Sequence, residues 1–198
     1  MKAFFHKYGY NIFKMFLYQF AISMFGSTLA MATTSSGNPS LTIVVSICAV
    51  LFYLFLIYVM VWEIGAQDKI LVDVGKKEYK PLTGLVLSLI ANIPNFIVAI
   101  VFTIGYPSMA AGEEWGSNIC AVMKVVLFIF EGMYLGILTA TKMTVGGVLQ
   151  SLNNLWWPYF LIILPAIITC GTAYFLGHKN IHFTSVVLYE DPKKKKKK

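Results

Sequence analysis

The sequence predicts an all-α membrane protein, a bundle of about five transmembrane helices. Of its 198 residues 58% are hydrophobic and only 13% are charged, whereas about 25% are charged in a soluble domain. The mean hydropathy is +0.70. Apolar stretches long enough to cross the roughly 30 Å hydrocarbon core recur at residues 10–33, 41–62, 82–104, 118–138 and 158–176. We therefore expect a single integral membrane domain over residues 1–198.

The charge of the chain bears on its partners. The net charge is +7, and most of it comes from the lysine run at 193–198. Without that run the chain is nearly neutral, so we do not expect nucleic acid as a partner. The expected partners are the lipid bilayer, other membrane subunits, and a small solute or a proton.

The first apolar stretch, 10–33, follows an aromatic and basic lead and contains Ala30-Met31-Ala32 near its end. This pattern also fits a cleaved signal peptide. The stretch is long for a signal peptide, so we predict a membrane helix. Gly26 and Ala30 form a pair of small residues four apart, which permits close packing against another helix.

The second stretch, 41–62, carries no charge, and Trp62 closes it as an anchor at the membrane interface. The polar segment 65–80 follows, and we predict that it is a cytoplasmic loop. Its apolar alternation at 70–74 also allows a small hairpin or an amphipathic surface piece.

The third stretch has the sequence Asn92-Ile93-Pro94-Asn95 at its middle. Proline inside a helix removes a backbone hydrogen bond, so we expect a kink or break at Pro94. Asn92 and Asn95 beside that break are not expected to face lipid. Many transporters build binding sites from such broken helices, although a kink satisfied by a neighbouring helix is the structural alternative.

The fourth stretch, 118–138, contains Lys124 and Glu131, and Trp115 precedes it as an anchor. A charge near the bilayer centre costs at least about 2.5–3.5 kcal/mol, so Glu131 is a candidate functional residue. Lys124 lies seven residues earlier on the same helical face, about 10.5 Å away along the axis. Because it is near the boundary, we interpret it as an anchor that reaches the interface.

Residues 143–157 are too polar for a crossing and too apolar for a solvated loop, and we predict an interfacial or re-entrant segment. Gln150, Asn153 and Asn154 within it are further candidates for a polar site. Trp156 and Trp157 form an aromatic belt before the last stretch. A polar tail with a polylysine end follows at 177–198.

Five crossings would place the two ends of the chain on opposite sides of the membrane. The early lysines and those of 65–80 favour a cytoplasmic N terminus, with Glu113 and Glu114 outside. The lysine tail would then lie outside unless 143–157 also crosses, and its side stays open. We predict an integral protein of a bacterial plasma membrane with a cytoplasmic N terminus.

Two functional hypotheses follow. The first is a small-solute transporter, or its substrate-binding subunit, with a midplane site whose candidate residues are Glu131, Asn92, Asn95, Gln150, Asn153 and Asn154. The second is a non-catalytic accessory or scaffold subunit that uses its intramembrane polar residues to pair with partner helices. The sequence has no HExxH or GxSxG motif, so an enzyme is the weaker alternative. We predict no catalytic residues, no metal site and no cofactor.

Overall fold

The computed structural model describes residues 2–181. The predicted polylysine end lies outside this part of the chain. Five of its helical segments are long and apolar enough to cross a membrane. The prediction of an all-α, multi-pass membrane protein is therefore confirmed.

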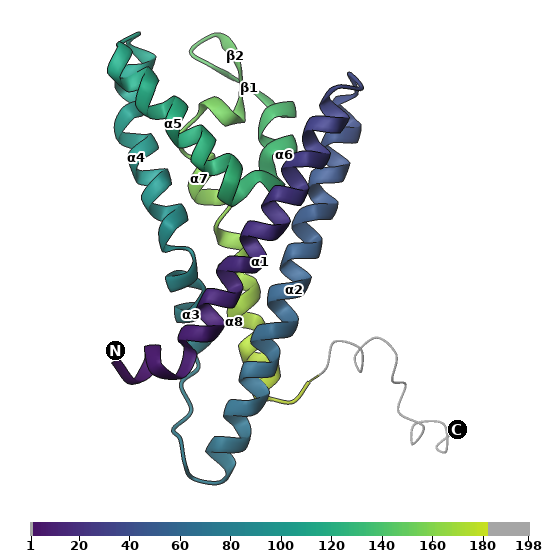
Figure 1. Cartoon of the computed structure of the whole chain (residues 1–198), viewed down its shortest axis with the longest axis vertical. Helices are drawn as coiled ribbons and strands as arrows, with labels where there is room; N and C mark the ends of the chain where they lie inside the picture. The colour runs from purple at the N-terminus through teal and green to yellow at the C-terminus, as the bar shows by residue number, and fades with distance from the viewer. Residues whose placement is uncertain (1, 182–198) are drawn as a thin grey trace, which may run out of the picture.

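The first two helices, α1 (Lys2–Thr34) and α2 (Pro39–Asp73), form a long antiparallel pair (Figure 1). The Asn38 side chain caps α2 by accepting hydrogen bonds from the backbone N–H groups of Ser40 and Leu41, at 3.1 and 3.3 Å. Asparagine is among the best residues at this position, because its oxygen satisfies N–H groups that have no partner in the first turn.

Helix α2 extends well beyond the predicted second crossing. Its 35 residues measure about 52 Å at 1.5 Å per residue, against a hydrocarbon core of about 30 Å. The prediction of a loop from residue 65 was therefore wrong up to Asp73. Between 63 and 73 no proline interrupts the helix, and Gly65 packs so closely on α8 that an added Cβ would lie 2.4 Å from the Tyr174 carbonyl oxygen. The chain turns at Gly75, where φ is +69°.

The predicted break in the third stretch is confirmed. Helix α3 (Thr83–Ala91) ends before Asn92, whose φ and ψ of −91° and 5° are not helical, and α4 (Ile93–Ala110) begins directly after it. Pro94 therefore lies in the first turn of α4. The N–H groups of the first turn have no partner within the helix, so proline, which lacks this group, loses no hydrogen bond there. This explains why the helix restarts at Pro94.

The fourth apolar stretch does not cross the molecule. Helix α5 (Glu114–Glu131) begins at the end where α4 stops, and a 3-10 turn, η1 (Gly132–Tyr134), then reverses the chain. Helix α6 (Leu135–Ala140) returns to the same end (Figure 1). Where the sequence predicts one crossing at 118–138, the structure has a helical hairpin that enters and leaves at the same end, here called the re-entrant hairpin. By length and composition alone the segment Glu114–Ala140 would suffice for a crossing.

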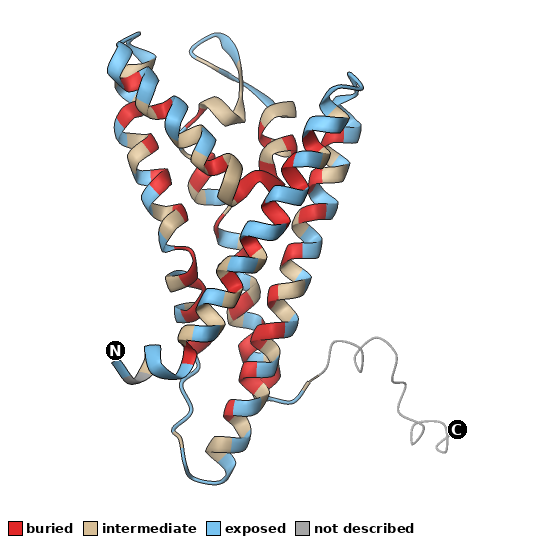
Figure 2. Cartoon of the chain, in the orientation of Figure 1, coloured by how far each residue is buried: buried red, intermediate tan, exposed pale blue. Residues whose placement is uncertain are grey.

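Glycines explain why the reversal is possible at this place. A Cβ at Gly132 would lie 2.7 Å from the backbone oxygen of Ser23 in α1, and one at Gly136 would lie 2.1 Å from Ser46 Oγ in α2. The Ser23 hydroxyl also donates to the Phe130 carbonyl at 2.6 Å. Figure 2 shows the turn as a buried segment against α1. Close packing on two long helices thus holds a non-helical backbone inside the protein.

A β-hairpin follows, formed by β1 (Lys142–Val145) and β2 (Val148–Ser151), with Val145 paired to Val148. Gly146 and Gly147 form its two-residue turn with φ of +58° and +81°, as a type I′ turn requires. The hairpin projects from the end of the molecule (Figure 1). Residues 142–151 therefore lie outside the helix bundle, and the interfacial or re-entrant placement of 143–157 in a membrane stays a prediction.

The last stretch begins with a 3-10 turn, η2 (Leu152–Asn154), and a short helix, α7 (Pro158–Leu161), and continues as α8 (Leu164–His178). Helix α8 packs mainly on α2 and α3 and runs to the end that holds the start of α1 (Figure 1). The two ends of the described chain therefore lie at the same end of the molecule. This differs from the predicted arrangement because the fourth stretch turns back.

Candidate functional site

Glu131 lies at the tip of the re-entrant hairpin. It is the last residue of α5, where the backbone leaves the helix with φ of −127° and ψ of 20°. Its side chain points into the protein and is only 4% exposed. The reversal of the chain therefore carries this carboxyl group to Gln19, which lies in the middle of α1.

One oxygen of Glu131 has a partner and the other has none in the described structure. The amide of Gln19, itself 2% exposed, donates to Glu131 Oε1 at 2.8 Å. No protein group between residues 2 and 181 bonds to Oε2, and no cation there forms an ion pair with it. A buried carboxyl oxygen without a partner is costly, and such groups often mark a site that a ligand completes.

A cavity of about 280 Å³ lies beside Glu131. Its polar lining consists of Glu131, Lys124, Asn153 and Tyr159. The remaining walls are mostly apolar side chains of α5, α6 and the start of the last stretch: Val125, Leu127, Phe128, Leu135, Leu138 and Ile162. Small-molecule sites commonly combine apolar walls with a few polar groups in this way.

Lys124 lines this cavity and has a polar partner within the protein. Its Nζ donates to Asn154 Oδ1 at 2.7 Å and lies 6.0 Å from the centre of the Phe102 ring. The neighbouring Asn153 accepts from the Tyr159 hydroxyl through its carbonyl oxygen, at 2.6 Å. Of the three polar candidates from 143–157, Asn153 thus lines the cavity and Asn154 bonds to the lysine that lines it. Gln150 lies instead in strand β2, opposite Met143.

Asn92 and Asn95 form a separate polar group. The Asn95 amide donates to Asn92 Oδ1 at 2.9 Å, and the Asn92 amide donates to the Ser88 carbonyl at 2.9 Å. Neither residue lines the cavity beside Glu131. The structure therefore does not bring these asparagines into one site with Glu131. They bond to each other at the α3–α4 break, and Asn95 Oδ1 is buried there without a partner among the described residues.

The tryptophans proposed as interface anchors lie in different surroundings. Trp115 and Trp156 are exposed, and the indole of Trp115 donates to Glu113 Oε2 at 2.6 Å. Trp62 is only partly exposed, and its indole donates to the Ile181 carbonyl at 2.8 Å. Trp157 is also partly exposed. Their role as membrane anchors stays a prediction.

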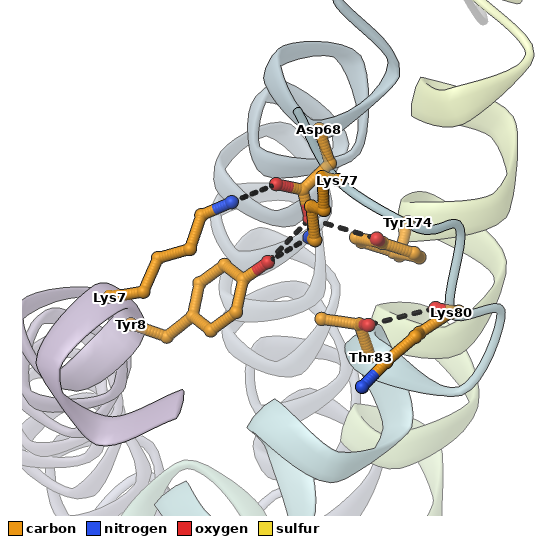
Figure 3. A network of polar contacts seen from close by, with 7 residues as sticks. All are labelled: Lys7, Tyr8, Asp68, Lys77, Lys80, Thr83 and Tyr174. Carbon is orange, nitrogen blue, oxygen red and sulfur yellow. Dashed lines mark hydrogen bonds and ion pairs between the residues drawn. The ribbon is translucent and has the colours of Figure 1, made fainter. Parts of the chain in front are cut away.

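A second polar cluster surrounds Asp68 at the end of the bundle where α1 begins and α8 ends (Figure 3). Lys7 forms an ion pair with Asp68 Oδ1 at 2.8 Å, and Lys77 forms one with Oδ2. The hydroxyls of Tyr8 and Tyr174 donate to Oδ2 at 2.5 and 2.8 Å. Donors from α1, α2–α3 and α8 thus meet on one carboxylate, which ties these segments together.

The Asp68 cluster is buried to different degrees. The Asp68 side chain is 3% exposed, that of Lys77 is 18% exposed and that of Lys7 is 39% exposed. Burial lowers the pKa of the Lys77 ammonium, and the hydrogen bond and charge of Asp68 act in the opposite direction. Because both oxygens of Asp68 have partners, this cluster is saturated and has the character of a structural clamp.

No metal-binding group of three or more His, Cys, Asp or Glu side chains occurs within residues 2–181. Comparison with protein-family models, with curated proteins and with solved structures found no match. The functional argument therefore rests on the two polar clusters and the cavity.

Sequence reasoning missed Gln19 and the whole Asp68 cluster. Gln19 carried a usable signal, because it is an amide in the middle of an otherwise apolar stretch. Asp68 and Lys77 carried none, since charged residues in a polar segment usually face water. Only the continuation of α2 to Asp73 turns Asp68 toward α1 and α8.

Proposed function

We propose that the protein is a small-solute carrier, or the solute-binding subunit of one, which binds its solute in the cavity beside Glu131. The observation that carries the proposal is Glu131 Oε2, a buried oxygen without a protein partner in the described chain, on a residue that lines the cavity. An ionisable residue at membrane depth is expected to serve a function.

The broken helices support the same proposal. Irregular backbone at membrane depth is tolerated where it is buried in protein or lines a cavity, and transporters use it to present polar groups to solutes. The η1 turn places Gly132 and Glu131 side by side on the cavity wall. The re-entrant hairpin therefore supplies both the turn and the acidic group at one place.

The test is to identify small molecules that accompany the protein. The wild type and the Glu131→Gln and Glu63→Gln variants are purified in mild detergent, and the molecules released on unfolding are identified by mass spectrometry. Glu63 is an exposed acid on α2 and serves as the matched control. We expect a compound that is retained by the wild type and by Glu63→Gln and lost from Glu131→Gln.

The accessory-subunit hypothesis predicts a different result. In that case a second membrane chain co-purifies in a fixed ratio, and Glu131→Gln leaves both the bound small molecules and solute uptake into proteoliposomes unchanged. The burial of Glu131 and its bond to Gln19 of the same chain favour the solute-binding proposal, because a partner helix meets little of this side chain.

A further inference from the structure

The cavity beside Glu131 carries one acidic and one basic side chain. Glu131 ends α5, and Lys124 lies seven residues earlier on the same helix; both line the cavity. Seven residues of α-helix correspond to about 10.5 Å along the axis. The two residues form no ion pair with each other within the described structure. The cavity thus has a separate acidic and a separate basic end.

At the acidic end, one oxygen of the Glu131 side chain has no partner. Gln19 occupies Oε1, while Oε2 is buried and has no partner among residues 2–181. A ligand ammonium would supply both a hydrogen-bond donor and the compensating charge. Charged hydrogen bonds of this kind contribute about 1.5–3 kcal/mol each.

At the basic end, Lys124 offers donors. Its ammonium has three N–H groups, and the structure gives it one hydrogen bond, to Asn154. The side chain is half-buried and reaches toward the segment that precedes α7. A ligand carboxylate bound here would gain a charged hydrogen bond without displacing Asn154.

Between these ends the walls are apolar, with Leu127, Phe128 and Leu135 among them. A simple cation would be attracted by Glu131 but repelled by Lys124, and the reverse holds for a simple anion. A neutral solute would offer a partner charge to neither side chain. Only a solute with both charges, and an apolar portion between them, matches every part of the lining.

We infer that the solute is a small zwitterion whose ammonium and carboxylate are separated by a short methylene chain. The ammonium binds Glu131 and the carboxylate binds near Lys124. This inference rests on the proposed function and specifies the substrate class of the same site. An α-amino acid carries its ammonium and carboxylate on the same carbon, so it reaches only one end at a time.

Calorimetric titration of the full chain in lipid nanodiscs tests the inference with four probes of similar size. These are 5-aminopentanoate, its isomer norvaline, pentylamine and pentanoate. We expect 5-aminopentanoate to bind at least about tenfold more tightly than the other three, as one charged hydrogen bond predicts. Equal binding of norvaline, or equal binding of pentylamine, overturns the inference.

Two variants test the assignment of each end. Glu131→Gln should weaken 5-aminopentanoate about tenfold or more and tighten pentanoate, while Lys124→Met should weaken 5-aminopentanoate and tighten pentylamine. If Glu131→Gln fails to fold, Lys124→Met still tests the inference, because Lys124 is only half-buried. Glu63→Gln is the control and should match the wild type. Failure of all four probes also overturns the inference. The proposed function is then judged separately, by whether Glu131→Gln loses a co-purified compound.

Discussion

At the scale of single residues, the buried pair of Gln19 and Glu131 is the feature most open to a quantitative test. Gln19→Leu leaves Glu131 Oε1 without its donor in an apolar setting, and we expect a loss of about 1–3 kcal/mol in the free energy of unfolding. Unfolding in mixed micelles, followed by circular dichroism, measures the change.

The double variant Gln19→Leu/Glu131→Leu supplies the control for this pair. Replacing both partners by apolar groups of similar shape can be nearly neutral, so the double variant should be more stable than Gln19→Leu alone. A double variant that loses the full sum of the two single effects would show that the residues act independently.

The lysines of the Asp68 cluster should differ in importance because their burial differs. Lys77→Met removes a mostly buried partner of Asp68, and we expect a loss of about 2 kcal/mol in the free energy of unfolding. This is less than a fully broken buried pair costs, since three donors remain. Lys7 is more exposed and screened, so Lys7→Met should cost no more than about 1 kcal/mol. Equal losses in thermal or denaturant unfolding would contradict the clamp described for Lys77.

At the scale of elements, the re-entrant hairpin depends on glycine at the places where it touches α1 and α2. Gly132→Ala puts a methyl group 2.7 Å from the Ser23 backbone oxygen, and neither backbone yields easily. We expect a loss of about 1–3 kcal/mol in the free energy of unfolding.

Gly9→Ala provides a matched control within α1. A Cβ at Gly9 meets nothing within 4 Å, and alanine favours a helix over glycine by about 1 kcal/mol. The variant should therefore be as stable as the wild type or more so. If Gly132→Ala behaves in the same way, the close approach of η1 to α1 is not what holds the hairpin.

At the scale of the whole molecule, most of the lysines of the described chain lie toward one end. The connection between α2 and α3 carries Lys76, Lys77 and Lys80, and Lys179 follows α8 at the same end (Figure 1). Glu113 and the hairpin that begins at Lys142 lie at the other end. Because cytoplasmic segments carry the excess of lysine, this distribution supports a cytoplasmic start of α1 and a cytoplasmic end of α8.

Labelling with a membrane-impermeant maleimide tests this orientation in intact cells. Thr144→Cys, in strand β1, should react from outside. Lys76→Cys and Lys179→Cys should react only after the cells are permeabilised. Reaction of Lys76→Cys and Lys179→Cys from opposite sides would instead require five full crossings.

The sequence by itself determined the class of the molecule and some of its local features. Apolar length and low charge are enough to indicate a membrane protein, because the bilayer imposes these on every crossing. Pro94 was enough to predict the α3–α4 break, since its missing N–H acts locally. Gly146-Gly147 is an equally local signal for the β-hairpin.

Only the tertiary structure decided the course of the fourth stretch and the composition of the site. Hydropathy cannot distinguish a crossing from a re-entrant hairpin, because both are apolar and long. The difference arises where Gly132 and Gly136 meet the backbones and small side chains of α1 and α2. Those contacts join residues about a hundred positions apart, and they place Glu131 beside Gln19 and the cavity and apart from Asn92 and Asn95. Such long-range packing depends on the whole chain, which is why no local pattern revealed it.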